Sequence, residues 1–577
     1  MPRPADGSAQ LAKQDLPPPT DFRRPARVAA RATLALVALG VLWRVARFAS
    51  GPPLWGDEAF IAVNLLVRDY AGMLRTLEYY QIVPLGFLWA ELAVVRILGG
   101  SEWAVRLIPF LAGLASLGLF ARFATRSVDR RAALVAVGIF AASYYLVRHA
   151  TEVKPYAPDL LLGLGATMLA WSLRDHPTSS RRWAALTLTV GLGVWFSYPL
   201  VFVAGGLGVF LLTRVVVRSA HARAVGAFLA FGAIGGGSWL ASYLAFGRPQ
   251  AQAAPFYSRI ETWRGAFPPL GRPWAIPAWL LDVHTGNMLA YPLGANHFGS
   301  VATAALVAVG AARLWRSRRD LVLLLLSPLP LMLLASCFRL YPYGTSARTT
   351  LFLAPAFCLL AGVGLMALVR RSRSAPRRGR WLRLAVVGLG AIPLIAAVAN
   401  VAQPYKNWED WLNRQAVERR AALARPGDRW LVTDGLDARL ESRHAILEHW
   451  VQQVAEVRYN ILAEAPVPAR WLPAPRALAE ASRAGRTWLI VHRTECPAFD
   501  EARLQAARRQ LERRLGPPRV HRFALTRGES LTAYHFPGPG SADPPGEAEV
   551  ARAPTPTPAV GVPWAVDYDE TIRRVTP

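Results

Sequence analysis

Long apolar stretches separated by short basic loops constrain this chain more than any other feature of its sequence. The apolar stretches fall near residues 28–48, 106–123, 132–149, 157–173, 183–199, 200–217, 225–246, 297–312, 321–338, 350–369 and 382–400. Each stretch is close to the roughly 20 residues that a helix needs to cross a bilayer. The sequence therefore predicts an all-α polytopic membrane protein with about eleven transmembrane helices.

Arginine-rich loops set the predicted orientation of these helices. They lie near residues 122–131, 174–182, 214–223, 313–319 and 370–383. Short loops rich in Lys and Arg remain in the cytoplasm. An even number of apolar stretches separates each loop from the next, so all five loops can share that side. We expect the N-terminus inside and the C-terminus outside. A cleaved signal peptide also begins with basic residues, but the many later stretches favour a retained first span.

The net charge of +28 would suit a protein that binds nucleic acid. The basic residues lie in loops between apolar stretches, however, and only 18% of the chain is charged while 53% is hydrophobic. We therefore predict a lipid bilayer as partner and no nucleic acid. No phosphate-binding Gly-rich motif follows a strand, so an energy-dependent pump or a nucleotide-sugar enzyme lacks support.

The predicted membrane domain covers residues 25–400 and has two large outer loops, 49–105 and 247–295. The first loop contains an apolar segment, residues 83–98, that also carries Glu91 and Arg96. We interpret this segment as an amphipathic helix on the outer surface, because a further span would place the next basic loop outside.

After residue 400 the composition becomes that of a soluble protein. Residues 401–536 predict a small extracytoplasmic α/β domain, with strands at 429–434, 486–492 and 530–536 and a helix at 499–515. The terminal segments, 1–24 and 537–577, are rich in Pro and polar residues, and we predict both to be disordered.

An acidic pair, Asp57 and Glu58, follows the first span by a few residues. Carboxylates at a membrane edge are costly unless they are solvated or functional. Adjacent side chains do not share a helix face, so one carboxylate can meet a substrate while the other orients a neighbour. The alternative is a solvated loop with a helix N-cap, since acidic residues are common at helix starts.

Two further outer turns collect charged residues. Residues 148–159 crowd Glu152, Lys154 and Asp159 into a tight turn with Tyr156, and a second turn ends at Arg348. Guanidinium groups at the membrane edge suit a lipid-linked phosphate. The alternatives are an interfacial charge cluster for the first turn and snorkelling to head groups for Arg348 and Arg106.

The sequence gives little support for a metal or a cofactor. Its three cysteines form no framework, and His284 stands alone in the long outer loop. No spacing of His, Cys and Asp matches a closed metal site, so we predict no cofactor, and a divalent metal has no support in the sequence.

The order of these motifs resembles the protein O-mannosyltransferase superfamily, which includes the bacterial lipid A aminoarabinose transferases. The matching segments are Pro53-Leu-Trp-Gly-Asp57-Glu58-Ala59, Pro84-Leu-Gly-Phe-Leu-Trp, Gly100-Ser-Glu-Trp-Ala-Val-Arg106-Leu-Ile-Pro109, Glu152-Val-Lys154-Pro-Tyr156-Ala-Pro-Asp159 and Tyr341-Pro-Tyr-Gly-Thr-Ser-Ala-Arg348. The resemblance covers roughly residues 28–400. One departure is that the family's usual His-Pro-Pro reads Ile82-Val83-Pro84 here.

This resemblance implies a GT-C membrane fold and a glycosyltransferase in the bacterial cytoplasmic (inner) membrane. The donor would be a sugar on polyprenyl phosphate, transferred with inversion to a hydroxyl of a lipid, glycan or protein. The implied catalytic residues are Asp57 as base, Glu58 as its partner or stand-in, and Glu152 near the oxocarbenium-like centre. The implied donor-phosphate ligands are Arg348, Lys154 and Arg106, and the implied substrate contacts are Trp55, Tyr156 and Asp159.

Two other functions fit a polytopic chain of this kind. A lipid or sugar transporter or flippase would show repeats and ionisable groups near the midplane, whereas the charges here gather at the outer ends of the spans. A catalytically silent sugar-lipid-binding protein would keep the same motifs, so sequence does not separate it from an enzyme.

Overall fold

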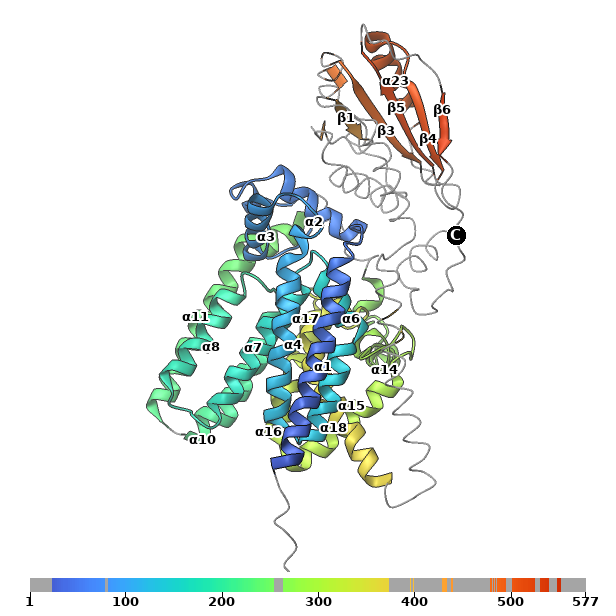
Figure 1. The fold of residues 1–577 in the computed structure, drawn as a ribbon. Coiled ribbons are helices and arrows are strands. Elements are labelled where there is room, and N and C mark those ends of the chain that lie inside the picture. Colours follow the sequence, from blue (N-terminus) through green and yellow to red (C-terminus); the bar gives the residue numbers. More distant parts are fainter. Residues whose placement is uncertain are drawn as a thin grey trace, which may run out of the picture.

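The computed structural model describes residues 23–77, 81–219, 221–253 and 263–372. Beyond residue 372 it describes chiefly residues 428–432, 437–438, 485–493, 501–524, 530–538 and 547–551. Helices fill the first part, and a sheet with one helix fills the second (Figure 1).

A set of packed helices forms the body of the protein (Figure 1). They are α1 (Arg23–Ala49), α4 (Leu107–Ser127), α5 (Arg130–Ala142), α7 (Tyr156–Leu173), α8 (Ser180–Gly193), α9 (Leu200–Leu211), α11 (Ala222–Ser242), α15 (Val301–Ser317), α16 (Arg319–Leu326), α17 (Pro328–Cys337) and α18 (Ala354–Ser372). The other α-helices of this part of the chain are α2 (Gly56–Val67), α3 (Leu85–Leu98), α6 (Tyr144–Arg148), α10 (Val217–Ser219), α12 (Arg248–Ala253) and α14 (Ile276–Thr285).

A multi-pass, mostly helical membrane protein is confirmed, but the count of eleven spans is not. Five helical segments in the described residues are long and apolar enough to cross a bilayer, or six if α5 and α6, bent by 56°, form one span. Helices also occupy the other predicted stretches up to residue 369, but each of these helices is shorter than the five segments that can cross a bilayer. One example is α8, which ends at Gly193 although its predicted stretch runs to residue 199. The last predicted stretch, 382–400, lies outside the described residues.

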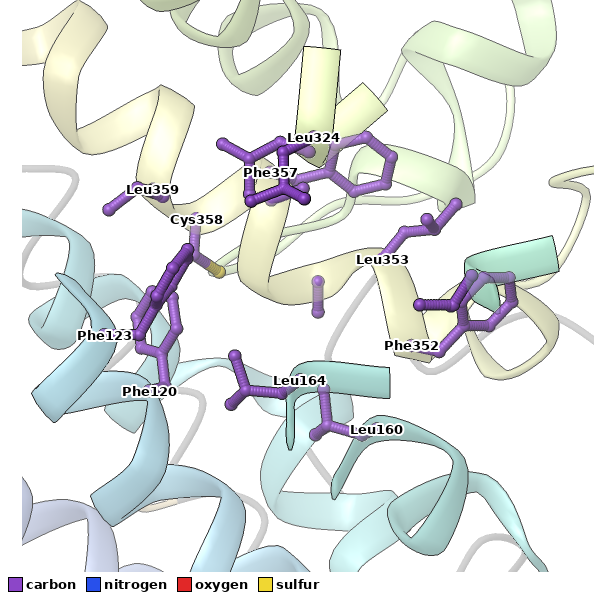
Figure 2. Close-up of a cluster of buried hydrophobic side chains, with 14 of the residues drawn as sticks. Phe120, Phe123, Leu160, Leu164, Leu324, Phe352, Leu353, Phe357, Cys358 and Leu359 are labelled. Atoms are coloured by element: carbon purple, nitrogen blue, oxygen red, sulfur yellow. The ribbon is translucent and has the colours of Figure 1, made fainter. Parts of the chain in front are cut away.

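The core of the helical body is built from large apolar side chains of helices that are distant in sequence. Phe120 and Phe123 of α4 face Leu160 and Leu164 of α7, and Phe357 comes from α18 (Figure 2). Each of these side chains is less than 3% exposed. Close packing here fixes the ends of α4, α7 and α18, and those ends carry the charged turns.

The basic loops meet at one end of the helical body. Arg370, from the fifth loop, binds Asp129 of the first loop at 3.0 Å. Asp320, from the fourth loop, lies 4.0 Å from Arg174 of the second loop and 3.4 Å from Arg218 of the third. The predicted common side of these loops therefore agrees with the structure.

The opposite end of the body carries α2 and α3 (Figure 1). The predicted helix at 83–98 is present as α3, and it ends at Gly99, whose φ of +82° favours glycine. Its predicted polar face is only partly correct. Arg96 is exposed and donates to the carbonyl of Arg68, whereas Glu91 is fully buried beside the apolar residues of α3 that pack on α2.

The C-terminal sheet confirms the predicted strands and helix of the α/β segment. It contains β1 (Arg429–Val432), β2 (Asp437–Ala438), β3 (Thr487–Arg493), β4 (Arg519–Ala524), β5 (Ser530–Phe536) and β6 (Glu547–Ala551), in the order β2-β1-β3-β5-β4-β6. Helix α23 (Glu501–Leu515) packs its leucines against this sheet. Strand β6 lies within 537–577, which the sequence predicts to be disordered. It forms because its backbone pairs with the edge of β4.

Small residues allow one helix pair, α15 and α18, to approach closely. A Cβ added at Gly364 of α18 would overlap the carbonyl oxygen of Leu306 in α15, and one added at Gly310 would overlap that of Leu360. Membrane helices commonly use glycine in this way, since backbone contact replaces the missing hydrophobic drive.

We therefore expect Gly364→Ala to destabilise the protein by about 1–3 kcal/mol through overpacking. Thermal unfolding of the purified protein in detergent measures this as a lower midpoint. The matched control is Gly118→Ala in α4, where an added Cβ meets nothing within 4 Å. Equal midpoints for the two variants would contradict the close approach.

Candidate functional site

The acidic pair lies in the first turn of α2, at the end of the body opposite the basic loops. Helix α2 begins at Gly56, after Trp55 as its N-cap. The backbone N–H of Trp55 donates to Glu58 Oε2 at 3.4 Å, which is the part of a capping box that the N3 carboxylate supplies. Negative charge at a helix N-terminus is favourable, so the local sequence itself holds both carboxylates at this point.

Glu58 forms a buried, bidentate ion pair with Arg106, which begins α4 as its N-cap. Arg106 Nε donates to Glu58 Oε1 at 2.9 Å and Nη2 donates to Oε2 at 2.7 Å. The side chains are 1% and 3% exposed, respectively. Arg106 also donates to the carbonyls of Pro52 and Pro53. This pair therefore ties the start of α2 to the start of α4.

Glu58 makes a further contact with the turn that carries Lys154. The backbone N–H of Val153 donates to Glu58 Oε1 at 2.9 Å. Because Val153 precedes Lys154, the buried carboxylate of Glu58 sets where the Lys154 side chain starts. Three segments that are distant in sequence thus meet at one carboxylate.

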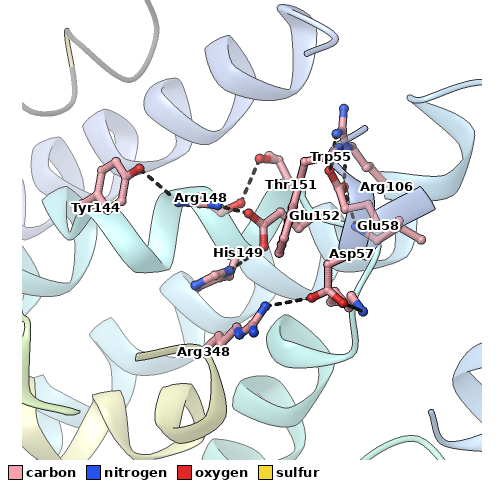
Figure 3. Close-up of polar contacts among 12 residues, drawn as sticks. Trp55, Asp57, Glu58, Arg106, Tyr144, Arg148, His149, Thr151, Glu152 and Arg348 are labelled. Carbon is pink, nitrogen blue, oxygen red and sulfur yellow. Dashed lines mark hydrogen bonds and ion pairs between the residues drawn. The ribbon is translucent and has the colours of Figure 1, made fainter. Parts of the chain in front are cut away.

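Asp57 points to different partners and keeps access to solvent (Figure 3). Lys154 Nζ donates to Asp57 Oδ1 at 2.9 Å, and Arg348 Nη1 donates to Asp57 Oδ2 at 2.7 Å. The Asp57 side chain is 23% exposed, whereas Lys154 and Arg348 are 6% and 8% exposed. Two buried cations therefore flank the more accessible carboxylate, and burial lowers the pKa of Lys154 despite the opposing effect of Asp57.

Aromatic rings cover the guanidinium of Arg348. Its Cζ lies 5.8 Å from the ring centroid of Trp55 and 5.2 Å from that of Trp263. Cation–π contacts of this kind fix a guanidinium while leaving its edge for hydrogen bonds. Trp55, predicted as a substrate contact, thus lies directly beside the predicted phosphate ligand.

Glu152 lies in a separate charged cluster at the junction of α6 and α7. Arg148 Nε donates to its Oε1 at 2.7 Å, and His149 Nδ1 lies 2.7 Å from its Oε2. Burial alone would raise the pKa of Glu152, but His149 and Arg148 hold it well below the ordinary value. Glu152 is 2% exposed, so its carboxylate is committed to these partners.

The two remaining predicted residues flank this cluster. The Tyr156 ring packs edge-on against His149, with centroids 5.3 Å apart. Asp159, in the first turn of α7, is 6% exposed and has one oxygen without a hydrogen-bond partner among the described residues. Both residues lie at the start of α7, directly after the turn that carries Lys154.

Sequence reasoning missed three residues of this region. Gln81 Oε1 accepts from Lys154 Nζ at 2.9 Å, and Trp263 covers Arg348. Gln250 clasps the backbone of Val83, since its Oε1 accepts from the N–H at 3.0 Å and its Nε2 donates to the carbonyl at 3.1 Å. Glutamines alone in outer loops carry no sequence signal for such contacts.

His284, which stands alone in the sequence, has both ring nitrogens close to hydrogen-bonding partners within the protein. Its Nδ1 lies 2.7 Å from the carbonyl oxygen of Leu280, and its Nε2 lies 3.2 Å from the hydroxyl of Tyr343. Within the described part of the chain, no group of three or more His, Cys, Asp or Glu side chains is arranged to hold a metal ion.

We expect Arg106→Ala to destabilise the protein by about 3–5 kcal/mol, because it leaves Glu58 buried without its partner. Chemical unfolding of the detergent-purified protein measures this loss. The double variant Glu58→Met with Arg106→Met removes both charges and should be more stable than Arg106→Ala. If Arg106→Ala is as stable as the parent protein, the ion pair does not hold the starts of α2 and α4 together.

The sequence was compared with protein families and with curated proteins. Residues 83–235, about a quarter of the chain, match the family described as dolichyl-phosphate-mannose-protein mannosyltransferase. No curated protein matches the sequence.

Solved structures of ArnT from Cupriavidus metallidurans match most of the chain. The apo form has a TM-score of 0.52 at 13% identity, covering 88% of this chain and 98% of ArnT. ArnT bound to undecaprenyl phosphate has a TM-score of 0.50 at 13% identity, covering 89% and 98%. At such low identity the likeness establishes the fold. The chain is therefore a membrane protein of the GT-C fold, similar over residues 83–235 to the family described as dolichyl-phosphate-mannose-protein mannosyltransferase.

Proposed function

We propose that this protein is a membrane glycosyltransferase that moves a sugar from a polyprenyl-phosphate donor to a hydroxyl-bearing acceptor, with inversion at the anomeric carbon. The observation that carries the proposal is the Asp57 carboxylate, partly exposed and held between Lys154 and Arg348. The family match and the ArnT fold support it, as does the undecaprenyl phosphate that ArnT binds in one of its structures.

The two cations suit the phosphate of the donor. A donor of this class is a phosphodiester that leaves as a phosphomonoester, so negative charge grows on the leaving group. Preorganised donors aimed at that charge lower the barrier most effectively in a site with little water. Lys154 and Arg348 meet this need because both are nearly buried, and Arg348 presents a guanidinium edge that matches phosphate oxygens.

Asp57 is the candidate general base. In this mechanism, the donor phosphate draws Lys154 and Arg348 away from the carboxylate, which is then free to accept a proton. The acceptor oxygen forms a bond to the anomeric carbon while the bond from that carbon to the phosphate oxygen breaks. The electron pair of the broken bond stays on the polyprenyl phosphate, and the proton of the acceptor hydroxyl moves to Asp57.

The other charged residues take positioning roles in this proposal. Glu58 and Arg106, which the resemblance implies as base partner and phosphate ligand, hold each other and thereby place Asp57 and Lys154. Glu152 orients its own turn through Arg148 and His149. Of the implied substrate contacts, Trp55 is the best placed, because it covers Arg348 beside Asp57.

The acceptor side would be formed by the outer segments of the chain. The loops 49–105 and 247–295 supply Gln81 and Trp263 to the region of the two cations. We further propose that this end faces outward from the bacterial cytoplasmic membrane, with the basic loops inside, and that residues 401–536 form an extracytoplasmic domain that contributes to recognition of the acceptor.

We expect Asp57→Asn to lower sugar transfer by about a hundredfold or more, since a positioned base contributes at least that much. Purified protein in lipid nanodiscs is incubated with labelled polyprenyl-phosphate sugars and a membrane extract, and labelled products are counted. The matched control is Asp282→Asn, which removes another exposed carboxylate, one from α14. Near-normal transfer by folded Asp57→Asn would refute its role as base.

The loss of the Lys154 charge at alkaline pH should lower kcat/KM. Because burial lowers its pKa, the lysine loses its proton, and its attraction for phosphate, at a lower pH than an exposed lysine would. Arginine keeps its charge at such pH values. Lys154→Arg should therefore move the alkaline limb of the pH profile of kcat/KM to higher pH. Coincident alkaline limbs for parent and variant would assign that limb to another group.

A further inference from the structure

A second charged site lies among the basic loops, at the end of the helical body opposite α2 and α3 (Figure 1). It is a cavity of about 400 Å³ where α4, α7 and the junction of α15 and α16 meet. Its lining comes from three of the five basic loops: Arg126, Trp171, Arg174, Asp175, Ser317, Arg318, Arg319 and Asp320. The mechanism proposed above uses none of these residues.

Hydrogen bonds and ring contacts hold the walls of this basic pocket in place. Arg318 Nη1 donates at 2.8 Å to the carbonyl of Ser127, the residue after Arg126. The Cζ of Arg174 lies 4.9 Å from the ring centroid of Trp171, which fixes the guanidinium over an aromatic face. Arginines from different loops are thus placed around one space.

Asp320 connects the lining of the pocket to two further arginines beside it, Arg214 and Arg218. It is 16% exposed and lies 3.3 Å from Arg214, 3.4 Å from Arg218 and 4.0 Å from Arg174. One carboxylate cannot balance three guanidinium groups. Counting only lining residues, four arginines face two aspartates, so the pocket has an excess of positive charge.

An excess of cationic loops alone would follow from topology, because basic residues gather on the cytoplasmic side of any such protein. Topology does not require those residues to converge on a cavity. A polar cavity lined by several guanidinium groups suits the tetrahedral oxygens of phosphate, and basic pockets between membrane helices recognise phosphate head groups.

We propose that the basic pocket binds a phosphate group of an anionic ligand. The size of the cavity suits the head group of an anionic membrane lipid, and a soluble phosphate has the same chemistry. The site is separate from the proposed transfer reaction, so binding can be measured without any sugar donor.

The test compares two double variants of the full-length protein in nanodiscs. Arg126→Gln with Arg319→Gln removes two pocket arginines. Arg122→Gln with Arg316→Gln removes two exposed arginines, one from α4, which also carries Arg126, and one from α15, which ends two residues before Arg319, and neither lines the pocket. Retention of phosphatidylglycerol in a phosphatidylcholine background is measured by native mass spectrometry, and binding of inorganic phosphate is measured by thermal shift in phosphatidylcholine alone.

We expect only the pocket variant to bind its ligand more weakly, by at least about tenfold, since each charge-assisted contact is worth about a factor of ten or more. Selective loss of phosphatidylglycerol identifies a lipid head group, and selective loss of inorganic phosphate identifies a soluble ligand. Equal losses in both variants, or no loss of either probe in the pocket variant, would overturn the proposal.

Discussion

The ion pair between Glu58 and Arg106 is the interaction on which the candidate site depends. It is almost completely shielded from water, and the low dielectric around it makes an unpaired partner costly. Through this pair and the N–H of Val153, the starts of α2 and α4 and the turn before α7 share one anchor. The positions of Asp57 and Lys154 follow from that anchor, so the catalytic proposal depends on an ion pair to which it assigns a positioning role.

The two adjacent carboxylates of the acidic pair differ in exposure and in hydrogen-bond partners. They occupy neighbouring places on α2, yet one is 1% exposed and the other 23%. Glu58 has its oxygens filled by arginine and backbone donors, whereas Asp57 holds two cations that a phosphate can compete for. This difference supports our proposal that Asp57, and not Glu58, takes the proton, a choice that the sequence leaves open.

Sequence patterns predicted the fold well where one strong physical rule applies. Apolar stretches and basic loops predicted the helices and their common basic end, because hydrophobic length and loop charge dominate membrane insertion. Span lengths were predicted less well, since turns such as the one after Gly193 shorten helices without a break in hydrophobicity. The convergence of Asp57, Lys154 and Arg348 was foreseen only as three motifs on one side. Gln81, Trp263 and Gln250 could not be foreseen, because their contacts depend on packing between loops that are distant in sequence.

The backbone contacts of Glu58 and Gln250 bear on how such a site can change over evolutionary time. Both side chains hold main-chain groups, at Val153 and at Val83, rather than the side chains of those residues. An apolar replacement at a clasped position leaves the clasp intact, but Val83 and Val153 are 2% and 0% exposed, so a polar side chain there would disturb the packing around the site. The course of the backbone beside the site therefore depends on Glu58 and Gln250, which are distant in sequence from the segments that they hold.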